Sequence, residues 1–270
     1  MPELVEVETY RVLAERLVGR TISAVEAPDD WYLKGSTTIS SLRAATVGHV
    51  VAAVRRIGKL LLIDIAGDGP PADGVTDGAT LGLHFGMTGR LMVDGDASID
   101  RLLYSTAKPD PAYERFALLF TDDGRMVMVD PRRLGSVELD PDEDRLGPDA
   151  ATITVAPLRD AIGGSTVALK ARLLDQRRIA GVGNLIADEV LWRAGLDPGR
   201  QAGSLDDREV RRLQRTLRRT ISVLADRGGS HTGDLMEERQ PGGHCPSDGA
   251  ELQRTTVGGR TTWWCPAHQV

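Results

Sequence analysis

In the first half of the chain, the hydrophobic positions first recur at helical spacing and then at the spacing of short strands. Pro2 suits the first turn of a helix because its φ is fixed and its nitrogen needs no intrahelical partner. The apolar positions after it keep helical spacing up to Gly19, and they are Leu4, Val7, Leu13 and Leu17. From about Thr21 to Leu139, short β-rich runs alternate with Gly, Asp and Pro, at residues 50–54, 60–65, 79–85, 116–120 and 126–129. This pattern predicts one helix followed by an antiparallel sandwich or barrel.

The second half changes to helical spacing after an acidic, proline-bearing segment. Residues 140–149 have the composition of a solvated linker between domains. Residues 185–194 form a helical run, and a later helix is expected to start at Ser204, with Asp207 three residues on. An apolar stripe at spacings of three and four continues that helix, through Val210, Leu213, Leu217, Ile221 and Leu224. The second half is therefore predicted to be a helical domain.

A β-hairpin is predicted at the end of the chain. Two β-branched or aromatic runs, 253–257 and 260–264, flank Gly258-Gly259, a dipeptide that suits a two-residue hairpin turn. The fold class is thus expected to be α+β. Its predicted parts are a helix and β-sandwich over residues 1–139, a linker over 140–150, a helical domain over 151–229, and a short loop with the hairpin over 230–270.

Overall charge argues against a nucleic-acid partner until its distribution is considered. The 270 residues carry 33 basic and 39 acidic side chains, a net charge of −6, with a pI of about 5.5. Residues 1–150 carry a net −9, whereas residues 151–270 carry +3. Because a polyanion is recognised by local positive surface, the helical and hairpin parts remain candidates for nucleic-acid contact.

Cysteine usage and the start of the chain both favour a cytoplasmic protein. The two cysteines lie in the last 26 residues, too few for a disulfide-stapled secreted scaffold. The first residues are acidic where a signal peptide would be basic, and no apolar run approaches the roughly 18 residues that a membrane span needs. We therefore expect neither secretion nor membrane insertion.

The hairpin is flanked by residues with the spacing of a zinc ribbon. Cys245-Pro-Ser-Asp248 and Cys265-Pro-Ala-His268 enclose residues 249–264. Cys245, Cys265 and His268 are usual zinc ligands, and either Asp248 or His244 would complete the tetrahedron. The alternative is a metal-free hairpin with two buried thiols.

Several further features carry chemistry only in combination. Ala180-Gly-Val-Gly-Asn184 precedes a helix, so its free N–H groups could bind phosphate, although such glycines also make simple interhelical turns. Removal of Met1 would expose the secondary amine of Pro2, whose pKa is low enough for a nucleophile, about 8 for α-amines in general. Glu3 could then move a proton. The alternative is a plain helix start, just as Lys59 and the Arg132-Arg133 pair could be ordinary surface charges.

Taken together, these motifs resemble the formamidopyrimidine-DNA glycosylase and endonuclease VIII family. The resemblance covers nearly the whole chain, and its motifs occur in the family's order. They are Pro2-Glu3-Leu4-x-Glu6-Val7-Glu8-Thr9, Gly58-Lys59, His84-x-Gly-Met-Thr-Gly89, Asp130-Pro-Arg-Arg-x-Gly135, Leu174-Asp-Gln-x3-Ala-Gly-Val-Gly-Asn184 and the hairpin with Arg260. It implies a catalytic N-terminal helix and β-sandwich, a helix–two-turn–helix domain, and a C-terminal zinc-finger hairpin.

The resemblance also implies an activity: excision of oxidised bases from DNA and cleavage at the abasic site, in base excision repair. Pro2 matches the nucleophile that forms a Schiff base with C1′ of the damaged nucleotide, and Glu3 matches the general acid. Lys59 matches the proton-transfer group for β-elimination, and Arg260 the phosphate contact that assists δ-elimination. The implied partner is damaged double-stranded DNA, bound by a monomer, and the implied cofactor is one structural Zn²⁺ held by Cys245, Asp248, Cys265 and His268.

DNA-contacting positions follow from the same resemblance. Glu6, His84, Lys170 and Asn184 match residues that face the DNA around the lesion. A base in such chemistry must leave the stack, and side chains must fill the hole it leaves; the residues at those positions are Met87, Arg132 and Leu134.

Two departures from the family pattern bear on the lesion. Leu134 stands where the family has an intercalating Phe, and only 15 residues, 230–244, lie between Gly229 and Cys245, fewer than formamidopyrimidine-type enzymes use to close over 8-oxoguanine. These departures favour endonuclease VIII-like pyrimidine or broad specificity, whereas Pro2-Glu3-Leu4 and Asp130-Pro-Arg-Arg favour the formamidopyrimidine branch. Oxidised purines are the favoured substrates, with oxidised pyrimidines as the alternative. Two other functions stay open: a non-catalytic binder of abasic or nicked DNA, and a zinc-ribbon protein unrelated to DNA.

Overall fold

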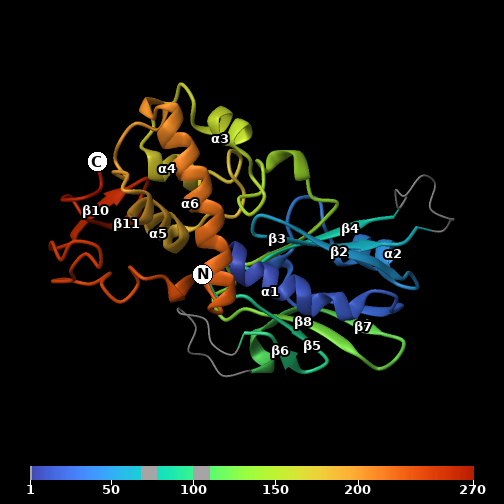
Figure 1. Cartoon of the computed structure of the whole chain (residues 1–270). Coiled ribbons are helices and arrows are strands. Elements are labelled where there is room, and N and C mark those ends of the chain that lie inside the picture. Colours follow the sequence, from blue (N-terminus) through green and yellow to red (C-terminus); the bar gives the residue numbers. More distant parts are fainter. Residues whose placement is uncertain (1, 68–77, 100–109) are drawn as a thin grey trace. The chain divides into compact units, whose positions relative to one another are not determined.

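The computed structural model describes residues 2–67, 78–99 and 110–270, which form two compact units (Figure 1). The first unit contains Pro2 and Glu6–Glu143, and the second contains Glu3–Val5 and Asp144–Val270. The helix α1 (Leu4–Ala14) thus begins in one unit and continues in the other. Among the helices of the described ranges, none has both the length and the apolar character needed to cross a bilayer.

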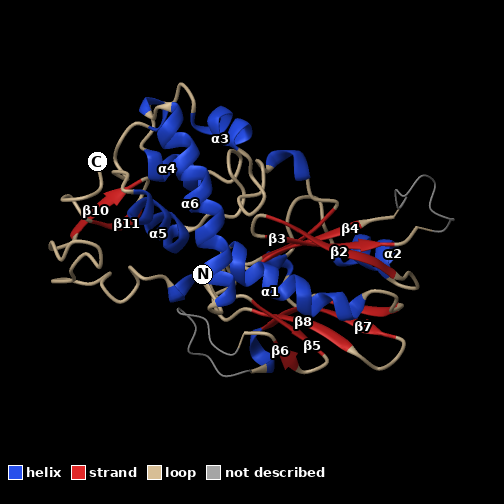
Figure 2. Cartoon of the chain, in the orientation of Figure 1, coloured by secondary structure: helices blue, strands red, loops and turns tan. Residues whose placement is uncertain are grey.

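The first unit is built from two antiparallel sheets, whose strands are drawn in red in Figure 2. One sheet has the order β1-β7-β8-β5-β6 and the other the order β2-β3-β4-β9. The strands are β1 (Ile22–Glu26), β2 (Val51–Ile57), β3 (Leu60–Ile65), β4 (Thr80–His84), β5 (Arg90–Val93), β6 (Asp96–Ala97), β7 (Glu114–Phe120), β8 (Arg125–Val129) and β9 (Ser136–Leu139). A short helix, α2 (Ile39–Thr46), accompanies them. All five strand runs predicted from the sequence are strands.

One hydrophobic core joins both sheets and α1. Residues of β3 such as Leu61 and Ile63 share this core with Phe116 and Leu118 of β7. The helix adds Tyr10, whose ring lies 4.5 Å from that of Phe85 between centroids. The two sheets and the helix each bury an apolar face against the others. This shared burial is the physical reason why the predicted sandwich forms.

The second unit is a helical domain followed by a hairpin. Its helices are α3 (Val155–Ile162), α4 (Leu169–Leu174), α5 (Asn184–Ala194) and α6 (Asp207–Asp226), and its strands are β10 (Gln253–Val257) and β11 (Arg260–Trp264). The predicted apolar stripe of α6 packs with Val190 and Leu191 of α5 in one core. The expected diglycine turn is present, since Gly258 and Gly259 have φ of +58° and +72°. The fold class expected from the sequence is confirmed.

The start of α6 differs from the sequence prediction. Asp206, not Ser204, is the N-cap, because its carboxylate accepts from Glu209 N at 2.8 Å while Glu209 accepts from Asp206 N at 2.9 Å. This reciprocal capping box satisfies two helix-end donors. The Ser204 hydroxyl instead donates to Gln201 O within the preceding turn. The predicted cap was therefore wrong by two residues.

The acidic segment 140–149 contains the boundary between the units, which falls between Glu143 and Asp144. Its second half is not a free tether. Gly147 N donates to Gln176 O at 2.9 Å, and Ala150 N donates to Ala180 O at 2.9 Å. These bonds hold the chain against the loop that leads into α5.

Candidate functional site

Glu3 is fixed at the N-terminus of α5. Its side chain is buried, and its carboxylate accepts from Leu185 N at 2.8 Å and from Ile186 N at 3.1 Å. Both N–H groups lack intrahelical partners at a helix start, where the helix dipole also favours negative charge. A Cβ at Gly183 would lie 2.1 Å from the Glu3 Cδ, so the glycine before α5 makes room for the carboxylate. Pro2, next to Glu3 in the chain, is buried as well.

Lys170 lies in a buried charge network. Its ammonium is 2.6 Å from the Asp188 carboxylate, and both side chains are at most 1 % exposed. Arg239 is the second cation on Asp188, at 2.9 Å. Burial lowers the pKa of Lys170, and the negative charge of Asp188 opposes that change. A buried ion becomes tolerable only when it is paired and hydrogen-bonded, as here.

The same lysine ties the hairpin to the helical domain. Lys170 Nζ donates to Thr261 O at 3.0 Å and to Thr262 Oγ1 at 2.7 Å. Asn184 Nδ2 donates to the same Thr261 carbonyl at 3.1 Å. Arg260, exposed at the first position of β11, directly precedes this anchor. The helical domain therefore fixes the backbone position from which the exposed Arg260 side chain extends.

In the first unit, Asp130 brings together the two loops that carry Met87, Arg132 and Leu134. The buried Asp130 carboxylate accepts from Thr88 Oγ1 at 2.6 Å on one loop. On the other loop it accepts from the backbone N–H groups of Leu134 and Gly135, at 2.9 and 2.7 Å. A Cβ at Gly86 would lie 2.3 Å from the Leu134 carbonyl carbon, so the loops touch at their backbones.

The loop after β8 presents its predicted side chains outward, whereas Met87 on the other loop is half-buried. Leu134 is 47 % exposed, which is unusual for a large apolar residue, and Arg132 is exposed too. Arg133 differs from Arg132 because it is bound by Asp29 through two contacts of 2.6 and 2.7 Å. Of the two adjacent arginines, Arg133 is structural, and Arg132 has its guanidinium at the surface.

Lys59 lies directly before β3 of the second sheet, and His84 is the last residue of the neighbouring strand β4. Lys59 follows Gly58 in the β2–β3 turn, and the next residue, Leu60, pairs with His84. His84 Nδ1 accepts from Gly86 N at 3.2 Å, which leaves Nε2 as the proton-bearing donor of the neutral ring. Glu6, by contrast, is 5 % exposed on α1.

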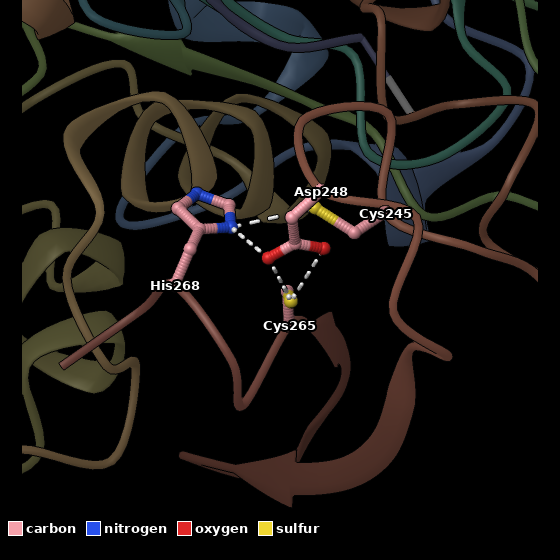
Figure 3. A group of neighbouring side chains, drawn as sticks. All are labelled: Cys245, Asp248, Cys265 and His268. Carbon is pink, nitrogen blue, oxygen red and sulfur yellow. Dashed lines mark hydrogen bonds and ion pairs between the residues drawn. The ribbon is translucent and has the colours of Figure 1, made fainter.

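The four predicted metal ligands converge in the second unit (Figure 3). His268 Nδ1 lies 3.4 Å from Cys245 Sγ and 3.6 Å from an Asp248 oxygen, which in turn lies 3.3 Å from Cys265 Sγ. Zinc bonds of about 2.0–2.3 Å place tetrahedral ligands about 3.3–3.8 Å apart, so the donor set fits Zn²⁺. His244 is exposed and is not in the cluster, which favours Asp248 as the fourth ligand.

Two contacts from Trp192 of α5 prepare this cluster for a metal. Its backbone carbonyl lies 2.8 Å from His268 Nε2, so that nitrogen carries the proton and Nδ1 keeps its lone pair. Its indole N–H donates to Cys245 Sγ at 3.3 Å, so this ligand sulfur is held in position from α5. The cluster therefore combines ligand spacing with the supporting hydrogen bonds expected of a metal centre.

Comparison with known proteins decides the family. The formamidopyrimidine-DNA glycosylase N-terminal domain matches residues 1–137, and the H2TH domain of the same enzymes matches residues 146–234. The chain belongs to the formamidopyrimidine-DNA glycosylase family. Relatives with that name include proteins of Gluconobacter oxydans, 33 % identical, and Paracoccus denitrificans, 34 % identical, each matched over 100 % of both chains.

Solved structures of family members agree over the full length. A complex of Lactococcus lactis Fpg with THF-containing DNA and an inhibitor has a TM-score of 0.81 at 26 % identity, covering 100 % of both chains. A complex of the same enzyme with DNA containing an oxidised pyrimidine has a TM-score of 0.80 at 27 % identity over 99 % of both. Family membership makes this protein a DNA glycosylase of DNA repair and removes the hypothesis of a zinc ribbon unrelated to DNA.

Sequence reasoning missed the residues that hold the candidate site residues in place. Asp188 and Arg239 surround Lys170, Asp130 joins the two loops, and Trp192 supports the metal ligands. Asp130 stood within a recognised motif, and its position after a buried strand could have marked it. Asp188 lies on α5, a helix whose residues are nearly all buried. A charged residue among apolar neighbours there indicates a buried ion pair, and this signal could have marked Asp188.

Proposed function

We propose that this glycosylase excises oxidised bases from duplex DNA and then cleaves the strand at the abasic site. The observation that carries the proposal is the fixed Glu3 carboxylate, one residue from Pro2 and bound to the start of α5. An acid that must serve a reaction at the Pro2 nitrogen needs a defined position, and two backbone N–H groups supply it.

The reaction we propose begins at the Pro2 nitrogen after Met1 is removed. That nitrogen attacks C1′ of the damaged nucleotide, the C1′–base bond breaks with its electron pair leaving on the base, and Glu3 assists by supplying a proton. The Pro2 nitrogen then loses its proton and the C1′–O4′ bond opens, with O4′ taking up a proton, which gives an iminium. The iminium acidifies C2′, from which Lys59 accepts or relays the proton as the 3′ phosphate leaves. Arg260 then stabilises the 5′ phosphate during the second elimination.

The proposed DNA contacts divide by chemistry. Met87, Arg132 and Leu134 would occupy the space left by the displaced base, because Asp130 holds their two loops together. Phosphate contacts are proposed for His84 through its Nε2–H and for Asn184 at the helix start, with Glu6 facing the lesion. Lys170 stays a predicted contact, although its ammonium is engaged by Asp188 and the hairpin.

For the lesion we propose oxidised purines first, with oxidised pyrimidines as further substrates. Structural relatives are complexes with Fapy-dG-containing DNA and with oxidised-pyrimidine DNA. Leu134 and the short segment 230–244 favour a broad range. A panel of both lesion classes, each opposite all four bases, would rank the substrates by single-turnover rate.

Borohydride trapping tests the nucleophile. The native chain is expected to form a covalent adduct with duplex DNA containing an abasic site, because borohydride reduces the proposed iminium. Pro2→Gly should lower the adduct yield by about tenfold or more, since a primary amine replaces the ring nitrogen. An undiminished adduct after this substitution rejects Pro2 as the nucleophile.

Binding without turnover would support the second candidate, a non-catalytic binder of abasic or nicked DNA. The exposed Leu134, in place of an aromatic wedge, is the observation that favours it. Release of any base from the lesion panel rejects this alternative.

We further propose one structural zinc ion held by Cys245, Asp248, Cys265 and His268. When bound, zinc would supply a tetrahedral link between the segment before β10 and the segment after β11. Cys265→Ser should lower the zinc content from about one per chain to near zero, because structural zinc sites need all four ligands. His244→Ala is the matched control and should leave the content unchanged. Elemental analysis of protein purified without added metal measures both, and zinc-free native protein contradicts the proposal.

A further inference from the structure

One face of α6 carries six arginines, which we name the basic face: Arg208, Arg211, Arg212, Arg215, Arg218 and Arg219. At about 100° per residue, they fall within an arc of about 120° that runs along some three turns of helix. The opposite side is the apolar stripe already described, with Leu213 and Leu217 fully buried. The helix is therefore strongly amphipathic, and between Arg208 and Arg219 this arc carries only arginines.

Three arginines of the basic face lack the counter-charges that other arginines of this protein have, whereas Arg212 lies 3.9 Å from Glu209. Arg55, for example, is held by two carboxylates at 2.6 Å. By contrast, Arg211, Arg215 and Arg219 are exposed and form no ion pair with any residue in the described ranges. Neighbouring like charges one helix turn apart repel each other. The positive potential of this face is thus left available for an external anion.

The basic face borders a hollow that also contains the apolar residues Ala151 and Ile221. This hollow has a volume of about 470 Å³ and is lined by Arg215, Arg218 and Arg219 together with Ala151, Gln214, Ile221 and Ser222. Arg218 is oriented across it, since its Nε donates to Ala151 O at 3.3 Å. A guanidinium rim around apolar side chains matches a ligand that carries both carboxylates and an apolar group.

This surface is distinct from the one that carries the candidate site of the second unit. The apolar stripe of α6 packs on α5, so the basic face points away from α5. Asn184 is the first residue of α5, and the hairpin with Arg260 packs against α5 as well. The basic face is therefore on the side of α6 opposite to α5, the helix that carries Asn184 and contacts β11.

We propose that the basic face and its hollow bind an acidic peptide segment of a partner protein, one that carries at least one large apolar side chain. Carboxylates of the peptide would pair with Arg211, Arg215 and Arg219, and the apolar side chain would enter the hollow over Ile221. A DNA backbone offers phosphates but no apolar side chain for the hollow, which is why a peptide fits better.

A labelled acidic peptide tests this proposal by fluorescence anisotropy. The probe is Asp-Glu-Asp-Leu-Asp-Glu-Asp-Ile-Phe, with a second peptide in which Asn and Gln replace the acids, and a third in which Ser replaces the apolar residues. Arg215→Glu combined with Arg219→Glu should weaken binding of the probe about 10- to 100-fold at low salt. Both arginines are exposed and unpaired in the described structure, so the variant should keep the native thermal midpoint.

Matched controls distinguish an effect of the basic face from an effect of net charge and from an effect on DNA binding. Arg43→Glu combined with Arg254→Glu makes the same charge change at exposed positions of α2 and β10 and should leave probe affinity within about twofold. Cleavage of a short damaged duplex should be unchanged in the α6 variant. Equal weakening by both double variants, or equal binding of the Ser or the Asn/Gln peptide, overturns the proposal. Loss of undamaged-duplex affinity confined to the α6 variant also overturns it, and assigns the face to DNA.

Discussion

Base release is expected to slow by about 10²–10⁴-fold when Glu3 is replaced by Gln, because an amide cannot donate the proton that a general acid supplies. Cleavage of a preformed abasic site should fall much less, since no base has to leave. Single-turnover assays on an 8-oxoguanine duplex and on an abasic duplex of the same sequence measure the two steps separately. A large difference between them would assign the acid role to Glu3.

A structural role for Glu3 predicts a different result. The carboxylate also binds Leu185 N and Ile186 N, and Gln keeps only one acceptor oxygen for them. If Glu3 merely positions the chain, both steps should fall together, and the thermal midpoint should fall with them. Glu15→Gln, beyond the end of α1, is the matched control and should leave both steps and the midpoint unchanged.

Stability of the second unit is expected to fall by about 3–5 kcal/mol when Asp188 is replaced by Ala, because two buried cations then lose their common partner. Lys170 and Arg239 both reach this carboxylate, at 2.6 and 2.9 Å. The loss should appear as a drop of about 6–20 °C in the midpoint of the thermal transition, followed by calorimetry. Hydrogen exchange of the amides at Thr261 and Thr262 should accelerate, since Lys170 holds that strand.

Removal of the lysine alone should cost less. In Lys170→Met the Asp188 carboxylate keeps Arg239, so one ion pair survives and the new side chain is apolar. The free energy of unfolding should therefore lie between that of the native chain and that of Asp188→Ala. Equal stability of Asp188→Ala and the native chain would show that the network contributes nothing to the fold.

Periodicity alone was sufficient for the outline of this protein. Strand-period runs predicted five strands of the sandwich, and the three-to-four spacing from Val210 to Leu224 predicted α6, because burial of one face imposes a period on the sequence. Helix ends were less predictable. Ser204 and Asp206 are both good caps, and only the hydrogen bonds of Glu209 distinguish them.

Ligand spacing predicted the metal cluster, but the choice of its fourth member depended on the folded chain. Asp248 and His244 are both near Cys245 in sequence, and only the folded turn brings Asp248 to 3.3 Å from Cys265 Sγ. The orientation of His268 depends on Trp192, 76 positions away in the chain. Contacts over such separations leave no periodic signal in a single sequence.

The sequence by itself determined the family, the order of the motifs and the identity of the chemical groups, since these are local strings of residues. Only the tertiary structure decided which of those groups are held and which are free. Lys170 is enclosed with Asp188, Arg133 is bound by Asp29 while Arg132 is exposed, and Glu3 rests on the first turn of α5. Burial and pairing depend on residues brought together from distant segments, and these decide whether a charge stabilises the fold or remains available to a ligand.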